Sequence, residues 1–522
     1  MSRILIYDTT LRDGSQTEGV SFSVSDKIKI TEKLDSLGVH YIEGGWPGSN
    51  PKDKEYYKHY KGKKLKNAIL TAFSMTRRAN TTCAEDKNIQ ELLHSGANTM
   101  TIVGKSWDLH VSDVLRVSLD ENLRMISDTV NYFKKHKMEV IYDAEHFFDA
   151  YKRNPDYALK SLQAAADAGA DWLVPCDTNG GTLPEEIGKI ITDLKAKFKI
   201  PLGIHCHDDL DMGVADSLAA IRAGCVQVQG TFNGLGERCG NANLTTIIGT
   251  LHTKYKIPSI PEKNIKQLMD TSYYIAEISN SPVASNAGFI GHRAFTHKGG
   301  MHIDAVIKNP VAYEHVEPSI IGNKRNFVTS ELAGKMPIVQ KAKQLNITLD
   351  KKSPQAKKLL KDLQEKEYSG YQFEAADASF ELFVKRALKK YKPFFKLESF
   401  KTTSERRFDG KVFAEASIRI NVGGESKYNA SDGSGPVEAL DKALRQVLKK
   451  FYPKLEEMHL IDYKVRVLDS KEGSAAKVRV LIESQDNHDS WTTVGVHENI
   501  IEASWEALTD SIEYKLLKDQ KK

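Results

Sequence analysis

The chain has 522 residues, of which 40% are hydrophobic, so it is long enough for about two to three domains with a substantial core. Its 74 basic and 69 acidic residues leave a net charge of only +5, a balance that argues against a nucleic-acid partner. The five cysteines are odd in number and lack CxxC spacing, which argues against a disulfide framework. No apolar run approaches the roughly 18–20 residues of a membrane span, which argues against a membrane protein.

The first apolar run begins at Ile4, which leaves no room for a signal or transit peptide and predicts a cytoplasmic protein. From Ile4 to about Thr250, short apolar runs alternate with amphipathic helical stretches. The first of these stretches has Ser25 as a possible N-cap and Gly38 as the residue that ends it. The runs predict eight strands: Ile4–Tyr7, Tyr41–Glu43, Ala68–Thr71, Thr99–Val103, Glu139–Tyr142, Trp172–Pro175, Leu202–His205 and Val226–Gly230.

Eight strand–helix units in about 250 residues match the size and alternation of a (β/α)₈ TIM barrel, and the protein is therefore expected to be of the α/β class. A doubly wound sheet is the alternative, but units of similar length favour a closed barrel. In such a barrel the active site lies at the C-terminal ends of the strands. Polar motifs follow six of the expected strands: "DTTLRDG", "EGGWPGSNP", "DAEHFFD", "CDTNGG", "HCHDD" and "FNGLGERCGN".

The strongest chemical signal is the pair His205 and His207 at the end of the seventh expected strand. Residues i and i+2 of a strand point the same way, so both imidazoles can face one metal ion; the alternative is a buried His205 and a His207 that caps a helix. The loop with Asp13 adds a carboxylate from across the barrel, and Asn241 offers a carbonyl oxygen. This mixed N/O set suits a divalent ion, Mg²⁺, Mn²⁺ or Zn²⁺, while Cys206 is expected to face the core.

The three glycines of "NGLGERCGN" do not open a dinucleotide-binding βαβ unit in the required register. A tight turn that positions Asn241 is the preferred interpretation, with Glu237 and Arg238 paired to hold it.

After Pro258 the alternation gives way to helical segments and the loop-like "GFIGHRAFTHKGGMHIDAVIKNP". The Lys-rich stretch Val339–Glu367 also carries acidic residues, which favours a solvated helix face over a nucleic-acid patch. From about Phe394 two segments each read strand, turn, strand, helix, and they predict a small α+β domain with an internal repeat. The expected domains are a barrel (1–275), a helical linker that contributes to the active site (276–393) and a regulatory or dimerisation domain (394–522).

"YDTTLRDGSQ", "HCHDD" and "NGLGERCGN" together resemble the family of acyl-CoA condensing enzymes that includes the α-isopropylmalate, citramalate and homocitrate synthases. The order of the barrel, the "FTHKGGMH" segment and the duplicated C-terminal domain is similar to that family over essentially the whole chain. The resemblance implies a divalent metal ion and acetyl-CoA as co-substrate. It places metal ligands at Asp13, His205, His207 and Asn241.

The resemblance also implies roles for groups around the metal. Arg12 matches the family's carbonyl-polarising arginine, and Thr178 its substrate-carboxylate-binding threonine, with a helix or turn cap as the alternative for Thr178. Glu145 aligns with the glutamate near the reacting centre, with a structural salt bridge as its alternative. His302 aligns with the family's post-barrel histidine, although His297 lies in the same glycine-flanked segment. Tyr313 fits a tyrosine that assists catalysis.

The acceptor is a finer inference from the same resemblance. "EGGWPGSNPKD", and "DTNGG" in place of the more common "DTVG", are similar to the citramalate-forming branch, which uses pyruvate. Alternatives are 2-isopropylmalate synthesis from 2-oxoisovalerate, homocitrate synthesis from 2-oxoglutarate, a metal-dependent C–C lyase or aldolase, and a non-catalytic metabolite-binding protein. The long C-terminal domain argues against a lyase, and the intact metal set argues against a binding protein.

The resemblance further implies a homodimer whose C-terminal domain binds the pathway's end-product amino acid, here isoleucine. The turns Ser431–Pro436 and Thr492–Ile500 each precede an expected helix, where free N–H groups can hold a carboxylate. Helix capping without a ligand is the alternative for these turns.

Overall fold

The computed structural model describes residues 3–328, 353–373, 376–468 and 476–520. Within these ranges the chain forms two compact units, one of residues up to 295 with 316–325, the other of residues 296–315 with 326 onward. The division into domains 1–275, 276–393 and 394–522 stays a prediction.

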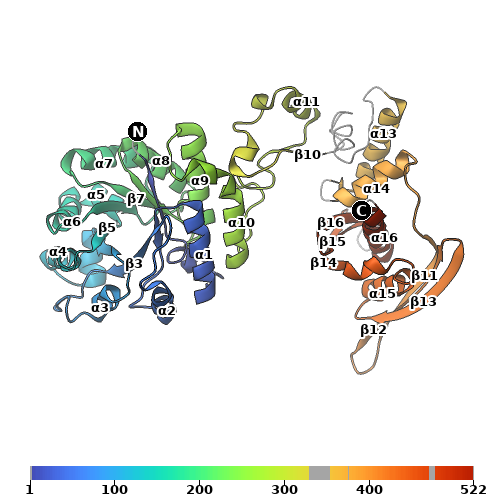
Figure 1. Ribbon diagram of the computed structural model, residues 1–522, viewed down its shortest axis with the longest axis horizontal. Coiled ribbons are helices and arrows are strands. Elements are labelled where there is room, and N and C mark those ends of the chain that lie inside the picture. Colours follow the sequence, from blue (N-terminus) through green and yellow to red (C-terminus); the bar gives the residue numbers. More distant parts are fainter. Residues whose placement is uncertain (1–2, 329–352, 374–375, 469–475, 521–522) are drawn as a thin grey trace. The chain divides into compact units, whose positions relative to one another are not determined.

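The first unit is a barrel of eight parallel strands in chain order, closed because β1 pairs with both β2 and β8 (Figure 1). Each predicted apolar run corresponds to one strand, so the predicted (β/α)₈ barrel is confirmed and the doubly wound sheet is excluded. The strands are β1 (Leu5–Asp8), β2 (Tyr41–Glu43), β3 (Ile69–Met75), β4 (Thr99–Lys105), β5 (Glu139–Glu145), β6 (Trp172–Asp177), β7 (Gly203–Cys206) and β8 (Gln227–Gly230).

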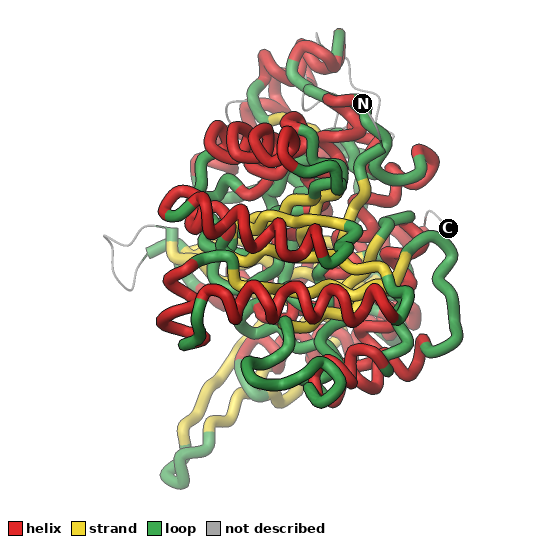
Figure 2. Tube along the Cα trace, turned by 90° about the vertical axis from the view of Figure 1, so that its left-hand side faces the viewer, coloured by secondary structure: helices red, strands yellow, loops and turns green. Residues whose placement is uncertain are grey.

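Helices surround the strands, as Figure 2 shows from the barrel side. Outward-facing strand residues such as Ile6, Ile42 and Ile102 are fully buried against them, while Tyr7 and Val174 belong to a separate cluster in the barrel interior. The helices are α1 (Val24–Leu37), α2 (Pro51–Tyr60), α3 (Lys87–Leu93), α4 (Leu119–Lys135), α5 (Phe147–Arg153), α6 (Pro155–Asp167), α7 (Pro184–Lys197), α8 (Gly213–Ala223), α9 (Leu244–Thr250) and α10 (Leu268–Ser279).

Helix α1 begins two residues earlier than predicted. Ser23, not Ser25, is its N-cap, because the Ser23 and Asp26 side chains bond reciprocally to each other's backbone N–H groups in a capping box. Ser25 already lies in the first helical turn. The predicted stop at Gly38 is confirmed, since this glycine has φ 96° in the left-handed region.

The second unit contains α11 (Gly300–Lys308), a short pair of strands β9 (Thr296–His297) and β10 (Asn326–Phe327), and helices α13 (Pro354–Tyr368) and α14 (Asp377–Ala387). The Lys-rich stretch lies partly outside the described residues. In its described part, α13, Lys357 and Lys361 are exposed while Leu359 and Leu363 are buried. This arrangement is that of a solvated amphipathic helix.

The C-terminal repeat is present, but each copy has three strands where the sequence predicted two. The first copy is β11 (Lys396–Arg406), β12 (Val412–Val422), β13 (Glu425–Gly433) and α15 (Pro436–Leu448); the second is β14 (His459–Val467), β15 (Val478–Gln485), β16 (Ser490–His497) and α16 (Ile500–Gln520). The additional strands β11 and β14 are largely exposed. The strand β11 lacks the alternation of apolar and polar residues that marks a half-buried strand, whereas β14 shows it from Asp462 to Val467 and was missed.

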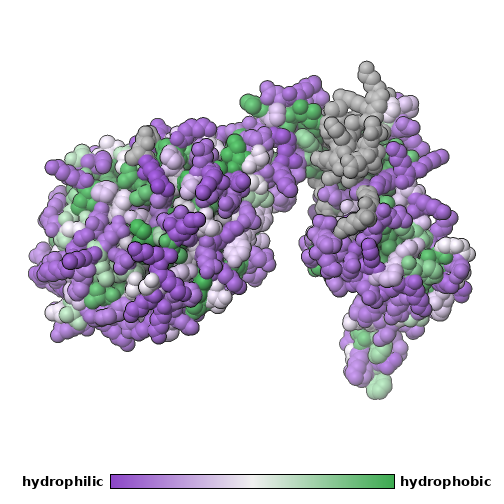
Figure 3. All heavy atoms as spheres, in the orientation of Figure 1, coloured by the Kyte–Doolittle hydropathy of each residue, from purple (hydrophilic) through white to green (hydrophobic). Residues whose placement is uncertain are grey.

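Hydrophilic side chains cover most of the barrel surface visible in Figure 3. Among the helices that the structure describes, none has both the length and the apolar composition required to cross a membrane.

Candidate active site

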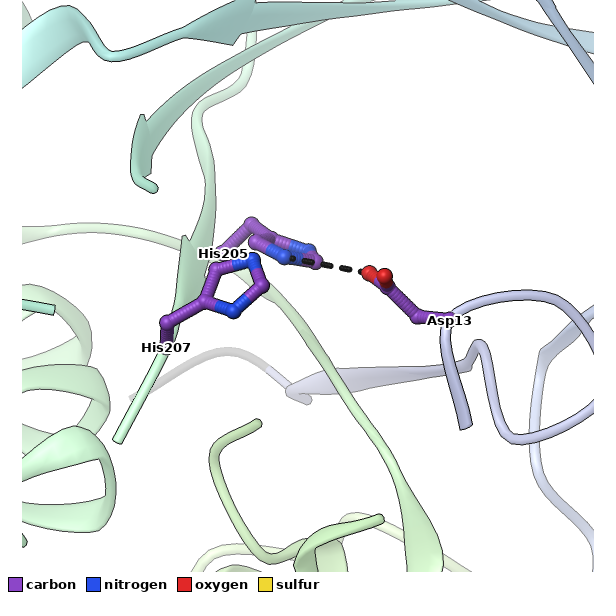
Figure 4. A group of neighbouring side chains, drawn as sticks. All are labelled: Asp13, His205 and His207. Carbon is purple, nitrogen blue, oxygen red and sulfur yellow. Dashed lines mark ion pairs between the residues drawn. The ribbon is translucent and has the colours of Figure 1, made fainter. Parts of the chain in front are cut away.

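Three of the four predicted metal ligands meet at the C-terminal rim of the barrel (Figure 4). His205 lies in β7, His207 directly after it, and Asp13 on the loop after β1. The Asp13 Oδ2 and His205 Nε2 atoms are 3.4 Å apart, and one ligand atom from each of the three residues lies within 4.8 Å of the others. Cys206 points away into the apolar core, as predicted. The alternation along β7 thus presents both imidazoles to one point.

Asn241 is held beside His207, since the two residues form an isolated β-bridge. It is fully buried, and its Nδ2 donates to the carbonyl of Leu235 at 3.4 Å. Among the described residues, its Oδ1 has no hydrogen-bond partner, and neither has Nδ1 of His207. A buried acceptor oxygen normally has a partner. A free oxygen beside two imidazoles and a carboxylate fits a divalent metal ion, and the donor set matches the prediction.

The predicted tight turn around Asn241 is present. A Cβ at Gly236 would lie 2.2 Å from Asn241 Nδ2, and Gly240 has φ 103°. Glycine at both positions lets the backbone approach the amide closely. The predicted pairing of Glu237 with Arg238 is wrong: the Arg238 guanidinium pairs with Asp209 at 2.8 Å, on the loop that also carries His207. Adjacent residues in a turn point in different directions, so a partner on the next loop is easier to reach.

The protonation states suit metal binding. Burial lowers the pKa of His205, and burial together with the neighbouring His205 lowers the pKa of His207 to about 3, so both imidazoles are neutral near pH 7. Burial alone would raise the pKa of Asp13, but Arg12 and the two histidines outweigh it and lower that pKa. One carboxylate and two neutral imidazoles are the forms that bind a cation.

Arg12 is held by two carboxylates and an aromatic ring. Its Nη1 lies 3.1 Å from Asp13 Oδ1, its Nε donates to Glu43 Oε2 at 2.6 Å, and its guanidinium lies 4.0 Å above the Phe73 ring. Burial alone would lower the pKa of Arg12, but Asp13 and Glu43 outweigh it and raise that pKa, so the side chain stays cationic. Arg12 is thus a fixed cation beside the metal site.

Glu43 is a site residue to which the sequence analysis assigned no role. It ends β2 and is fully buried. Its carboxylate accepts from the hydroxyls of Tyr7 (2.6 Å) and Thr9 (2.5 Å) in addition to Arg12. The sequence feature that could have identified Glu43 is its position, because it is the first residue of the "EGGWPGSNP" motif at the C-terminal end of a barrel strand.

A cavity of about 270 Å³ adjoins these groups. One part of its wall is apolar and another is charged. It is lined by Arg12, Asp13, Gln16, Trp46, Phe73, Met75, Val103, Lys105, Asp143, Glu145, Cys176, Thr178, His205, His207, Glu237 and Arg238. Burial, reinforced by Glu43, raises the pKa of Asp143 well above its usual value, so this carboxyl adds no full negative charge near neutral pH.

Glu145 and Thr178 both line the cavity and both have local partners. Glu145 forms an ion pair with Lys105. A structural salt bridge was the alternative to a catalytic role for this residue. Thr178 Oγ1 accepts from the backbone N–H of His146 at 2.9 Å, in the manner of a cap. These contacts leave the Thr178 hydroxyl hydrogen and the Glu145 carboxylate on the cavity wall, so the assigned roles stay predictions.

His302 and Tyr313 belong to the second unit, where their rings stack with centroids 4.3 Å apart. Both side chains are largely exposed. His297, the other candidate, is half-buried and its Nε2 lies 3.0 Å from Glu314 Oε1. The exposed histidine beside a tyrosine is the better candidate for contact with a ligand, and its catalytic role stays a prediction.

Family models cover most of the chain. An HMGL-like model matches residues 3–275, a homocitrate synthase post-HMGL domain-like model residues 289–368, and a LeuA allosteric (dimerisation) domain model residues 374–516. The (R)-citramalate synthase of Aquifex aeolicus (strain VF5) is 52% identical over 99% of this chain and 98% of its own length. The chain belongs to the HMGL-like family and, within it, to the (R)-citramalate synthases.

Other relatives support this membership. The (R)-citramalate synthase of Geobacter sulfurreducens is 50% identical over 100% of the chain and 99% of its own length. The 2-isopropylmalate synthase of Methanocaldococcus jannaschii is only 32% identical, over 99% of the chain and 96% of its own length. The resemblance seen in the sequence motifs is therefore confirmed, and the (R)-citramalate synthases are the nearer group of these two.

Replacement of His207 by alanine is expected to abolish tight binding of a divalent ion while the fold is retained, because a ligand is lost but little core packing. Calorimetric titration of Mn²⁺ into wild-type and H207A protein measures this, with circular dichroism as the check on folding. Unchanged Mn²⁺ affinity in H207A would remove the histidine from the ligand set.

Proposed function

We propose that the protein condenses acetyl-CoA with pyruvate and hydrolyses the thioester, giving citramalate and free CoA, as a step toward isoleucine. One water is consumed, a carbon–carbon bond forms between the acetyl methyl carbon and the keto carbon, and the thioester bond breaks. The observation that carries the proposal is the metal-ligand set Asp13, His205, His207 and Asn241 beside Arg12, in a chain that belongs to the (R)-citramalate synthases.

A divalent ion held by these four residues would act as a Lewis acid toward the carboxylate and keto oxygens of a 2-oxo acid. Its identity among Mg²⁺, Mn²⁺ and Zn²⁺ is left open by the donor set. Arg12 is positioned to donate hydrogen bonds to the keto oxygen as negative charge develops on it. The Thr178 hydroxyl is proposed to donate to the acceptor's carboxylate.

Glu145 is proposed to take the proton from the acetyl methyl group, since a general base must lie on the cavity wall. Its ion-pair partner Lys105 lies on the same cavity wall. His302 is proposed as a second catalytic group and Tyr313 as a tyrosine that assists, as the family resemblance implies.

The pyruvate assignment is tested by CoA-thiol release with acetyl-CoA and each of pyruvate, 2-oxoisovalerate and 2-oxoglutarate. We expect the highest kcat/KM for pyruvate. The apolar part of the small cavity wall should reject an isopropyl group by overlap, a larger penalty than the about 1–3 kcal/mol expected for a missing methylene. A higher kcat/KM for 2-oxoisovalerate would favour 2-isopropylmalate synthesis. Absence of thiol release with all three acids, together with cleavage of a 3-hydroxyacyl-CoA, would favour a C–C lyase.

Arg12→Lys should lower kcat by about 10²–10³ with a modest loss of stability, as when one oxyanion donor is removed. Lysine keeps the charge but lacks the planar fork that contacts Glu43 and Asp13 together. Steady-state kinetics and thermal melting of both proteins measure the two effects. A mutant that melts early yet turns over normally would make Arg12 a structural residue.

The C-terminal domain is proposed to form a homodimer contact and to bind isoleucine as a feedback inhibitor. Its first sheet exposes Leu397, Val412, Phe413 and Tyr428, apolar area that a second subunit would cover. The turns before α15 and α16 contain side-chain caps: Ser434 N–H donates to Glu438, and Ile501 N–H to Asn499, both at 2.8 Å. Side-chain caps, the alternative to a ligand at these turns, are thus present. A ligand bound there has to use N–H groups other than those of Ser434 and Ile501.

Isoleucine is expected to bind the full-length protein and to inhibit thiol release, with leucine and valine weaker. Isothermal calorimetry with the three amino acids measures binding, and sedimentation measures the oligomeric state. A dimer that binds none of the three would leave the domain as a dimerisation module.

A further inference from the structure

Two hydrogen bonds lead from the metal ligand His205 into the barrel interior. His205 Nδ1 lies 3.0 Å from Gln229 Oε1, and Gln229 Nε2 donates to Asp143 Oδ1 at 3.0 Å. Neither Gln229 nor Asp143 has a role in the proposed reaction so far. All three side chains are buried: His205 is 5%, Gln229 0% and Asp143 3% exposed.

The barrel fold brings these residues together from three strands. Gln229 lies on β8 in register with His205 on β7, so the two are neighbours across the sheet. Asp143 lies on β5, two strands beyond β7 in the barrel order. The bond between Gln229 and Asp143 therefore crosses the barrel interior, where water is scarce and each polar atom needs a fixed partner.

The direction of the two bonds determines the tautomer of His205. In the structure the amide nitrogen of Gln229 faces Asp143, and Asp143 Oδ1 accepts its hydrogen bond. The amide oxygen then faces His205, and because this oxygen can only accept, the hydrogen of the neutral ring must be on Nδ1. The lone pair is left on Nε2, the nitrogen that faces Asp13.

We propose that Gln229, oriented by Asp143, is a positioning residue that holds His205 in the tautomer and ring orientation that bind the metal through Nε2. This inference rests on the metal site of the proposed function. His207 differs, because among the described residues its Nδ1 has no hydrogen-bond partner. Before a metal binds, Nδ1 of His205 thus has a hydrogen-bond partner, and Nδ1 of His207 has none among the described residues.

Gln229→Met tests the proposal, because methionine has a similar length but forms neither bond. Loss of an outer-shell partner of a metal ligand typically weakens metal binding by about 10–100-fold, and that loss is expected for Mn²⁺ titrated into full-length Q229M.

Gln227→Met is the matched control. Gln227 lies two residues earlier on β8 and is equally buried, yet within the described chain neither of its amide atoms has a partner. Q227M should bind Mn²⁺ like the wild type.

Gln229→Glu separates the tautomer role from packing. A carboxylate at this position still accepts from His205 Nδ1–H, so Q229E should keep Mn²⁺ affinity within a few-fold of the wild type. Asp143→Leu removes the acceptor of the Gln229 amide hydrogen bond while keeping the branched shape of the side chain, and should give an affinity between those of wild type and Q229M. This nearly isosteric variant carries the test if Q229M does not fold, as judged by circular dichroism.

Wild-type affinity in Q229M or in D143L would overturn the proposal, and so would a loss in Q227M or Q229E as large as that in Q229M. Failure of the wild-type protein itself to bind Mn²⁺, Mg²⁺ or Zn²⁺ would instead remove the metal site of the proposed function.

Discussion

Two hydrogen bonds tie the loop after β1 to the loop after β8, and the geometry of the candidate metal site depends on them. Phe232 N–H donates to Thr10 Oγ1 at 2.9 Å, and Gly236 N–H donates to Thr17 Oγ1 at 2.7 Å. Asp13 lies between these two threonines in the chain. Because β1 and β8 are also paired along their length, groups more than 200 residues apart in sequence are fixed beside each other. Barrel closure therefore assembles the ligand set from loops that have no local reason to meet.

The same rim holds buried charged groups, and those around Arg12 are paired with one another. Removal of one member of a buried ion pair typically costs about 3–5 kcal/mol, because the other charge is left uncompensated. Arg12 has Asp13 and Glu43, and Glu43 in turn is held by the hydroxyls of Tyr7 and Thr9. The contacts that compensate the buried charge of the Arg12 guanidinium also fix its orientation. Stability and pre-organisation thus come from one network.

The sequence was sufficient for the barrel because eight short apolar runs alternate with amphipathic helical stretches and six of the runs end in polar motifs, a pattern that needs no tertiary information. It was sufficient for Asp13, His205 and His207 because strand ends in a barrel share one rim. It was insufficient for Gln229 and Asp143, since an inward-facing polar residue in a strand looks the same whether it binds a ligand, a neighbour or water. Strand β11 was missed because it carries no alternating apolar pattern, whereas β14 was missed although it alternates from Asp462 to Val467.

The surroundings of Arg12 explain how a small cavity can distinguish acceptors in the proposed reaction. Glu43 occupies the Nε edge, Asp13 one Nη nitrogen, and the Phe73 ring covers a face of the guanidinium plane. These contacts leave the N–H groups of Nη2 and the second N–H of Nη1, and Arg12 lines the cavity. An acceptor whose oxygens are held at this charged end must direct its remaining substituent elsewhere on the wall. Part of that wall is apolar, formed by Trp46, Phe73, Met75 and Val103. Every 2-oxo acid is thus oriented in the same way by its oxygens. The space at the apolar wall then decides which substituent is accepted.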